Sequence, residues 1–399
     1  MSTHFDTRSM TMKPSEGWYF PESCSVADFR QVVETSTDLA DYPWADDVTQ
    51  NVLIYGQRIS PGLGNPGTRR EIQAELAQAL LAGPGIVVFT QAFDPAVVDR
   101  ATTAFEALIA AQKASGVQSG DHFAKPGEND RVWGALGKLA MHDPEIFVDY
   151  YDNDLLALIS TAWLGPHYQV TSQINVVNPG GPAQVAHRDY HLGFMSAEQA
   201  AQFPDHVHQL TPALTLQGAV AHSDMPVETG PTMYLPHSQK YGPGYLAFHQ
   251  PDFTAYFESH FVQLPLAKGD AAFFNPALFH GAGTNRTANV RRMANLLQVS
   301  SAFGRAMETV DRTAVACGLY SVLSARLAAG ASEASIRNVI AASAEGYAFP
   351  TNLDRDPPIG GLAPQTPAQL LWQALNEGWP QAAFDRELTE YAYRRESGI

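Results

Sequence analysis

The middle third of the chain consists of short, strand-type segments, and this constrains the fold more than any other feature. Between residues 168 and 303, segments rich in Val, Ile, Phe and Tyr are separated by turns that contain Pro and Gly. Helical patterns do not alternate with them, which favours an antiparallel sandwich or jelly roll over a parallel sheet. The expected strand segments are residues 168–177, 184–194, 213–222, 232–236, 261–267, 271–276 and 291–303.

Helical patterns lie on both sides of this region. Those before it cover residues 70–83, 95–112 and 143–165, with a short strand-type run at 86–93. Those after it cover residues 307–330, 333–346, 367–375 and 384–395. We therefore expect a mainly β protein with flanking helices. The expected division is an irregular N-terminal segment (1–70), a core domain (71–305) and a helical C-terminal extension (306–399).

Charge and composition narrow the classes of partner. The 399-residue chain has a formal net charge of −16, which opposes binding to nucleic acid or to an anionic membrane. Its two cysteines, Cys24 and Cys317, are too few for a disulfide scaffold and fit a reducing compartment. The first residues contain no apolar signal region, and no apolar run is long enough to span a bilayer. We expect a cytoplasmic protein with a small-molecule partner, and a possible homo-oligomer formed through the C-terminal helices.

A candidate metal site begins at the tripeptide His187-Arg188-Asp189. On an extended strand, side chains two residues apart point to the same side, so the imidazole and the carboxylate lie together. Adding the distant His280 gives two imidazoles and one carboxylate, a set typical of non-haem Fe(II) with open coordination positions. Zinc is a lesser alternative for the same ligands.

A second His-x-Asp pair, His222 and Asp224, competes with the first. Asp224 stands directly before a Pro- and Gly-containing loop (225–231), where an aspartate more often forms a turn or a cap. We therefore favour the pair at His187 and Asp189. A hydrogen-bonded core histidine is the structural alternative for His280 itself.

A guanidinium group follows the distal histidine. Arg291 comes eleven residues after His280, across a Gly-rich turn, and could return beside the same strand to hold a carboxylate. Arg292 is the alternative. Strand alternation puts the two on opposite faces, and the hydrophobicity of those faces does not decide between them.

Several ordered blocks resemble the phytanoyl-CoA dioxygenase family of Fe(II)/2-oxoglutarate-dependent oxygenases, which includes ectoine hydroxylases. The similarity extends over about residues 75–305 and includes the HRD triplet and the Gly-Pro…Pro segment between the triplet and the distal histidine. The matching blocks are residues 80–108, 142–181, 187–189, 228–240 and 264–292.

The resemblance implies a double-stranded β-helix (jelly roll) fold, with Fe(II) as cofactor and 2-oxoglutarate and O2 as cosubstrates. Its motif order selects His187, Asp189 and His280 as metal ligands, and its spacing selects Arg291 for the cosubstrate carboxylate. It further places Asn175 and Gln173 beside the cosubstrate, and a solvated strand face is the alternative for both. Tyr190 and His191 are candidate contacts to the primary substrate, with a structural role as the alternative. Two positions depart from the family pattern, at Ala282 and in the turn that contains His237 and Gln239.

The expected function is a dioxygenase that hydroxylates a small molecule, with succinate and CO2 as co-products. Asp189 favours hydroxylation over halogenation, because related halogenases have a small residue at this position to admit chloride. The alternative is a non-catalytic jelly-roll protein that binds a metal or ligand. The polar stretch 196–211 is interpreted either as a lid over the site or as a solvated excursion.

Overall fold

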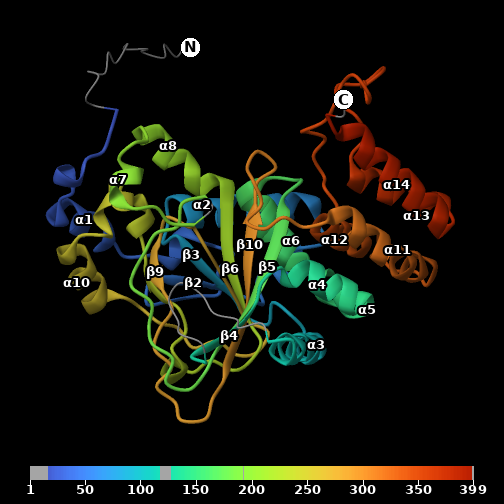
Figure 1. Ribbon diagram of the computed structural model, residues 1–399. Helices are drawn as coiled ribbons and strands as arrows, with labels where there is room; N and C mark the ends of the chain where they lie inside the picture. The colour runs from blue at the N-terminus through green and yellow to red at the C-terminus, as the bar shows by residue number, and fades with distance from the viewer. Residues whose placement is uncertain (1–16, 117–126, 192, 398–399) are drawn as a thin grey trace.

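A mixed eight-stranded sheet forms the centre of the computed structural model, which describes residues 17–116, 127–191 and 193–397 (Figure 1). The strand order is β1-β2-β3-β8-β6-β10-β5-β4, and every neighbouring pair is antiparallel except the parallel pair β2–β3. Two further strands, β7 and β9, form a small antiparallel sheet. The strands are β1 (Asp47–Thr49), β2 (Val52–Tyr55), β3 (Ile86–Phe89), β4 (Asn129–Val132), β5 (Gln169–Val177), β6 (Thr215–Ala221), β7 (Met233–Leu235), β8 (Ala271–Phe274), β9 (Phe279–Gly281) and β10 (Arg292–Ser300).

The two faces of the large sheet have different roles, as strand alternation requires. On β10, Met293, Leu297 and Val299 belong to the main hydrophobic core. The side chains that alternate with this face line a cavity on the opposite face; they are Arg292, Ala294, Leu296 and Gln298. One face of the sheet therefore holds the molecule together, and the other is available for a functional site.

Helices cover the core face and extend to both sides of the sheet (Figure 1). Several begin at clear sequence signals: α2 and α3 each have Pro at the first turn behind a capping Asn65 or Asp94. The helices are α1 (Val26–Val33), α2 (Pro66–Leu81), α3 (Pro95–Ala114), α4 (Ala135–His142), α5 (Pro144–Tyr151), α6 (Asp154–Leu164), α7 (Ala197–Ala200), α8 (Asp205–Leu210), α9 (Gly244–Ala247), α10 (Pro251–His260), α11 (Arg312–Ala328), α12 (Glu333–Ser343), α13 (Pro367–Glu377) and α14 (Gln381–Arg395).

The C-terminal helices share the core of the sheet domain. Leu319 and Leu323 of α11 and Phe384 of α14 are buried in the same cluster as Ile174 and Leu297 of the sheet. Figure 1 shows α11 beside α4 and α5, on the side of the molecule where the chain ends. The C-terminal helical extension is therefore packed against the sheet domain through this shared core.

Some sequence expectations differ from the structure. The segment expected to be irregular, 1–70, contributes β1 and β2 to the large sheet. Residues 129–132, where no strand is expected, also form a strand, β4. The expected strands at 184–194 and 261–267 form only isolated bridges, because each segment pairs with different partners along its length. Residues 196–211, interpreted as a lid or a solvated excursion, contain two short helices, α7 and α8, which fit either interpretation. The N-terminal residues considered for a signal region lie mostly outside the described part of the chain.

Among the described residues, no helix is both long and apolar enough to cross a membrane.

Candidate metal centre and cofactor cavity

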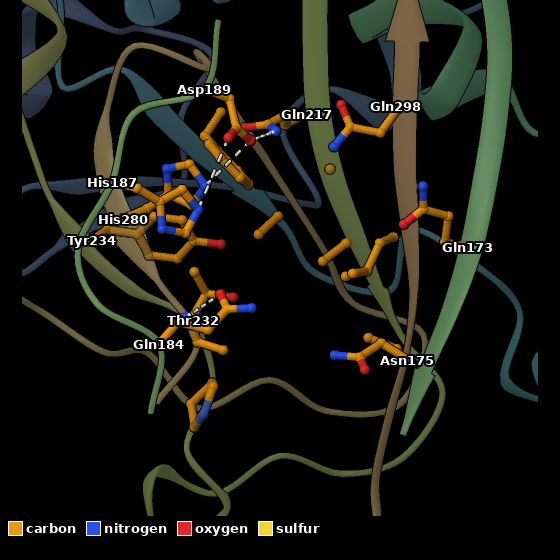
Figure 2. Close-up of a pocket in the computed structure, with 18 of the residues that line it drawn as sticks. Gln173, Asn175, Gln184, His187, Asp189, Gln217, Thr232, Tyr234, His280 and Gln298 are labelled. Atoms are coloured by element: carbon orange, nitrogen blue, oxygen red, sulfur yellow. Dashed lines mark hydrogen bonds and ion pairs between the residues drawn. The ribbon is translucent and has the colours of Figure 1, made fainter. Parts of the chain in front are cut away.

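Three predicted metal ligands meet at one point on the wall formed by the small sheet and the segment beside it (Figure 2). His187 and His280 form an antiparallel bridge with reciprocal backbone hydrogen bonds of 2.9 and 3.1 Å. Asp189 follows on the same side as His187, and the ligand atoms of all three residues lie within 4.8 Å of one another. The Nε2 atom of His187 is 4.0 Å from Asp189 Oδ1, and that of His280 is 3.8 Å from Asp189 Oδ2.

The backbone fixes the tautomer of each imidazole. His187 Nδ1 lies 2.9 Å from the carbonyl oxygen of Val185, and His280 Nδ1 lies 2.9 Å from that of Leu278. A carbonyl oxygen can only accept a hydrogen bond, so Nδ1 carries the proton and the lone pair that can bind a metal is on Nε2. Burial, together with the neighbouring His187, lowers the pKa of His280 to about 4, which keeps its ring neutral.

The carboxylate also has an open position. Asp189 Oδ2 accepts a hydrogen bond from the side-chain amide of Gln217, whereas the buried Oδ1 atom has no hydrogen-bond partner among the described residues. Two imidazoles and one open carboxylate oxygen that converge on one point fit a divalent transition-metal ion.

Arg188, between the two ligands, anchors this segment from behind. Its side chain points away from those of His187 and Asp189, as alternation predicts, and it is fully buried. The guanidinium donates to the carbonyl oxygen of Ser238 and lies 5.2 Å from the ring centres of both Tyr245 and Phe279. Burial lowers the pKa of Arg188 to about 10, which leaves the group charged.

A cavity of about 360 Å³ lies beside the three ligands. Figure 2 shows Gln298, Gln173 and Asn175 on the large sheet, across the cavity from His187 and His280. Thr232, Tyr234 and Gln184 stand on the same side as the ligands. The candidate metal site thus opens into a cavity that is large enough for small organic molecules.

The spacing argument selects Arg291 for this cavity, but the structure places Arg292 there. β10 begins at Arg292, and its cavity face continues with Ala294, Leu296 and Gln298. Arg291 is on the outside: its side chain is 47% exposed and lies 3.5 Å from both Glu106 and Asp130. The guanidinium that faces the cavity therefore follows His280 by twelve residues and not by eleven. Burial lowers the pKa of Arg292 to about 10, so the group remains a cation.

The other predicted contacts divide into two groups. Gln173 and Asn175 line the cavity, and Gln173 Oε1 accepts a hydrogen bond of 3.2 Å from Arg131. Tyr190 and His191 lie outside it, beside a second hollow of about 310 Å³. Tyr190 pairs with His208 at 3.0 Å and His191 with Thr215 at 2.7 Å, so their polar atoms already have partners within the protein. Their contact with a substrate stays a prediction.

The competing pair does not form a metal site in the structure. The two ring nitrogens of His222 lie 2.8 Å from Thr102 Oγ1 and 2.9 Å from Tyr150 Oη. Asp224 accepts a hydrogen bond from the backbone of Lys268. His222 is a hydrogen-bonded core histidine, and Asp224 is a loop residue.

Sequence reasoning missed Gln217, Arg131 and Trp133, which also line the cavity. A signal was present for Gln217, since it is the single side-chain amide within the largely apolar segment 213–222. Arg131 and Trp133 gave no signal, because they lie in a polar stretch without strand periodicity.

Residues 82–293 match the model of the phytanoyl-CoA dioxygenase (PhyH) family. This range is more than half of the chain, so the match establishes the family. The chain belongs to the phytanoyl-CoA dioxygenase family. A curated relative, Dioxygenase trt7 of Aspergillus terreus (strain NIH 2624 / FGSC A1156), is 34% identical over 128 residues, which are 32% of this chain. The match spans only 39% of that relative's length.

Solved structures with low sequence identity are also similar. The non-haem alpha-ketoglutarate-dependent carbocyclase SnoK from nogalamycin biosynthesis is 21% identical, with a TM-score of 0.41 over 57% of this chain and 83% of that one. AviO1 from Streptomyces viridochromogenes Tue57 is 18% identical, with a TM-score of 0.42 over 58% and 95%. Family membership and the three-residue site together identify Fe(II) as the cofactor of this phytanoyl-CoA dioxygenase family member, with 2-oxoglutarate and O2 as cosubstrates.

Proposed function

We propose that this chain is an Fe(II)/2-oxoglutarate-dependent dioxygenase that hydroxylates a small molecule and releases succinate and CO2. The observation that carries the proposal is the convergence of His187, Asp189 and His280 at the wall of a cavity that also contains a buried arginine. When bound, iron and 2-oxoglutarate activate dioxygen for the oxidation of a carbon–hydrogen bond.

The iron ligands would be Nε2 of His187, Nε2 of His280 and Oδ1 of Asp189. Their arrangement on one wall leaves the cavity side of the ion open to cosubstrates. Gln217 holds the other carboxylate oxygen, so Asp189 has a defined orientation before the metal binds. Asp189 fills the position that a halide would need, which supports hydroxylation over halogenation.

Arg292 would bind the far carboxylate of 2-oxoglutarate. Its buried guanidinium can form two parallel hydrogen bonds to a carboxylate, and Tyr234 and Thr232 line the same cavity. The side-chain amides of Gln173 and Asn175 offer N–H donors from the large sheet. Cosubstrate oxygens are suitable acceptors for these donors.

We also propose that the two sheets are the walls of a jelly roll. The support is the position of the cavity between them and the isolated bridges that extend the small sheet. These bridges join His187 to His280, Tyr234 to Val262 and Met225 to Leu266.

The test is an anaerobic titration of the purified protein with Fe(II) and 2-oxoglutarate. A weak visible charge-transfer band should appear, and admission of O2 should release succinate. His187→Ala should abolish both signals, because an imidazole ligand is lost. A protein that shows the band but releases no succinate with any small molecule would support the binding-only alternative.

A further inference from the structure

Two side-chain amide oxygens in the cavity lack hydrogen-bond partners among the residues that the structure describes. Gln217 is 4% exposed and Asn175 is 8% exposed, and both line the cavity. Neither Gln217 Oε1 nor Asn175 Oδ1 has a hydrogen-bond partner among the described residues. An unpaired buried acceptor lowers the stability of the folded protein by about 1–3 kcal/mol. A ligand or an ordered water therefore normally donates a hydrogen bond to it.

The orientation of the Gln217 amide is fixed by chemistry. Its Nε2 atom donates to Asp189 Oδ2. An ionised carboxylate can only accept, so the amide cannot be turned around without losing this bond. Oε1 is therefore an acceptor that requires a donor from elsewhere. Gln217 is paired in register with Gln298 on β10, which also lines the cavity.

The cosubstrate cannot supply that donor. 2-Oxoglutarate as a dianion has a ketone and two carboxylates, all acceptors, and it can use only the N–H groups of these amides. The donor must belong to another molecule in the cavity. An ordered water or the primary substrate can supply it.

The charges around the cavity restrict the kind of donor. Asp189 is the only acidic side chain among the described residues that line it, whereas Arg131 and Arg292 are cationic. An ammonium donor would face two guanidinium groups as well as the iron ion, which is unfavourable. A neutral donor does not have this cost.

Apolar side chains at the edge of the cavity indicate the rest of the substrate. Trp133 and Phe194 line the cavity, yet are 38% and 45% exposed. Exposed aromatic rings beside a buried site commonly contact the apolar part of a ligand.

We propose that the primary substrate is an uncharged alcohol with an apolar body, whose hydroxyl donates a hydrogen bond to Gln217 Oε1. This inference rests on the proposed function. Because Gln217 also contacts Asp189, the hydroxyl lies close to the iron and the oxidised carbon lies close to the hydroxyl-bearing carbon.

The test uses alcohol and ketone pairs that share one carbon skeleton: cyclohexanol and cyclohexanone, borneol and camphor, and a steroid alcohol with its ketone. Binding is measured without oxygen, from the change in the Fe(II)–2-oxoglutarate band. At least one alcohol should bind about five- to tenfold more tightly than its ketone, the ratio expected for one hydrogen bond. Gln217→Met should bring this ratio close to one.

Gln184→Met is the matched control. Gln184 is another amide of the same cavity, but its Oε1 already accepts a hydrogen bond of 3.1 Å from the backbone of Ala282. The alcohol preference should persist in this variant. Because each ratio compares two probes on one protein, a change in iron affinity affects both probes alike.

A second measurement does not require iron. If Asn175 Oδ1 serves a ligand and not the fold, Asn175→Leu should raise the unfolding temperature of the metal-free protein, because it removes an unpaired buried acceptor. A lowered temperature would show a structural role for Asn175. Equal binding of every alcohol and its ketone, or no binding by any alcohol, would overturn the inference. Failure of the band to form at all would instead contradict the proposed function.

Discussion

The guanidinium of Arg188 lies 5.2 Å from the centre of the Tyr245 ring, behind the segment that carries two metal ligands. This contact depends on Gly244, because a Cβ atom there would overlap the guanidinium of Arg188. The position of the metal ligands is thus linked to a glycine that does not itself touch the metal site.

Gly244→Ala should therefore displace Arg188 and weaken iron binding. We expect a loss of about 1–3 kcal/mol in the free energy of unfolding, as for other overpacked sites, with a higher Kd for Fe(II). Urea unfolding and metal titration measure the two effects. Gly137→Ala in α4 is the control, because a Cβ atom there has space and alanine favours a helix. Equal behaviour of the two variants would contradict this account of Arg188.

Replacing Arg292 should weaken 2-oxoglutarate binding far more than replacing Arg291. Arg292→Leu removes a buried guanidinium from the cavity, and we expect the Kd for 2-oxoglutarate to rise about 30-fold or more, since loss of a buried charge partner costs ~2–5 kcal/mol. Arg291→Leu alters an exposed group and should change this Kd less than about twofold. Anaerobic titration of both variants decides the matter. The reverse order would restore Arg291 as the cosubstrate ligand.

Removal of iron should lower the unfolding temperature. A ligand that binds only the folded state stabilises it, by about 2.7 kcal/mol at a concentration of 100 times its Kd. A chelator should therefore destabilise the wild-type protein in a thermal scan. His280→Ala should unfold at the same temperature with and without the chelator. A persistent difference in that variant would place the stabilising metal elsewhere.

Acid should destabilise the protein partly through His222. Burial lowers the pKa of this histidine from its ordinary value of 6.5 to about 3. The unfolded chain then binds the proton more readily, so stability is retained above pH 6.5 and falls as the pH drops towards 3. At pH 5 the loss from this group is about 2 kcal/mol. His222→Gln should reduce the loss between pH 7 and pH 5 by that amount, measured by urea unfolding of the metal-free protein. An unchanged pH dependence would contradict the assignment.

Deletion of residues 306–399 should prevent folding. Leu319 and Phe384 complete the same core as the sheet, and their removal would expose a large apolar surface. Circular dichroism and size-exclusion chromatography of the shortened chain test this. A folded 1–305 fragment that binds Fe(II) would show instead that the C-terminal helices form a separate extension.

The metal site could be predicted because the residue types and their close spacing in the sequence indicate metal binding. His187 and Asp189 are two residues apart on one extended segment, and His280 was identified by its place in a family pattern. The choice between Arg291 and Arg292 could not be made in this way. It depends on where β10 begins relative to its neighbours, and both faces of that segment have similar hydrophobicity.

The sheet was predicted where strands are long and apolar, as in β5, β6 and β10. It was missed at β1 and β4, which are short and polar, and at β2, which is apolar but only four residues long. β4 is buried because α3 and β5 pack beside it, and this is a tertiary effect that its own sequence does not show. The helices after residue 305 were recognised as helices, but their shared core with the sheet involves contacts between distant parts of the chain.

The paired backbone hydrogen bonds between His187 and His280 affect how the protein can lose and rebind its metal ion. Main-chain pairing brings the two imidazoles together, with their ring centres 4.4 Å apart. The entropic cost of joining such distant parts of the chain is therefore met during folding, before any ion binds. The ion can then dissociate and rebind without disrupting the backbone pairing that forms its binding site. A protein molecule that has lost its iron is inactive, and rebinding of iron is sufficient to restore its activity.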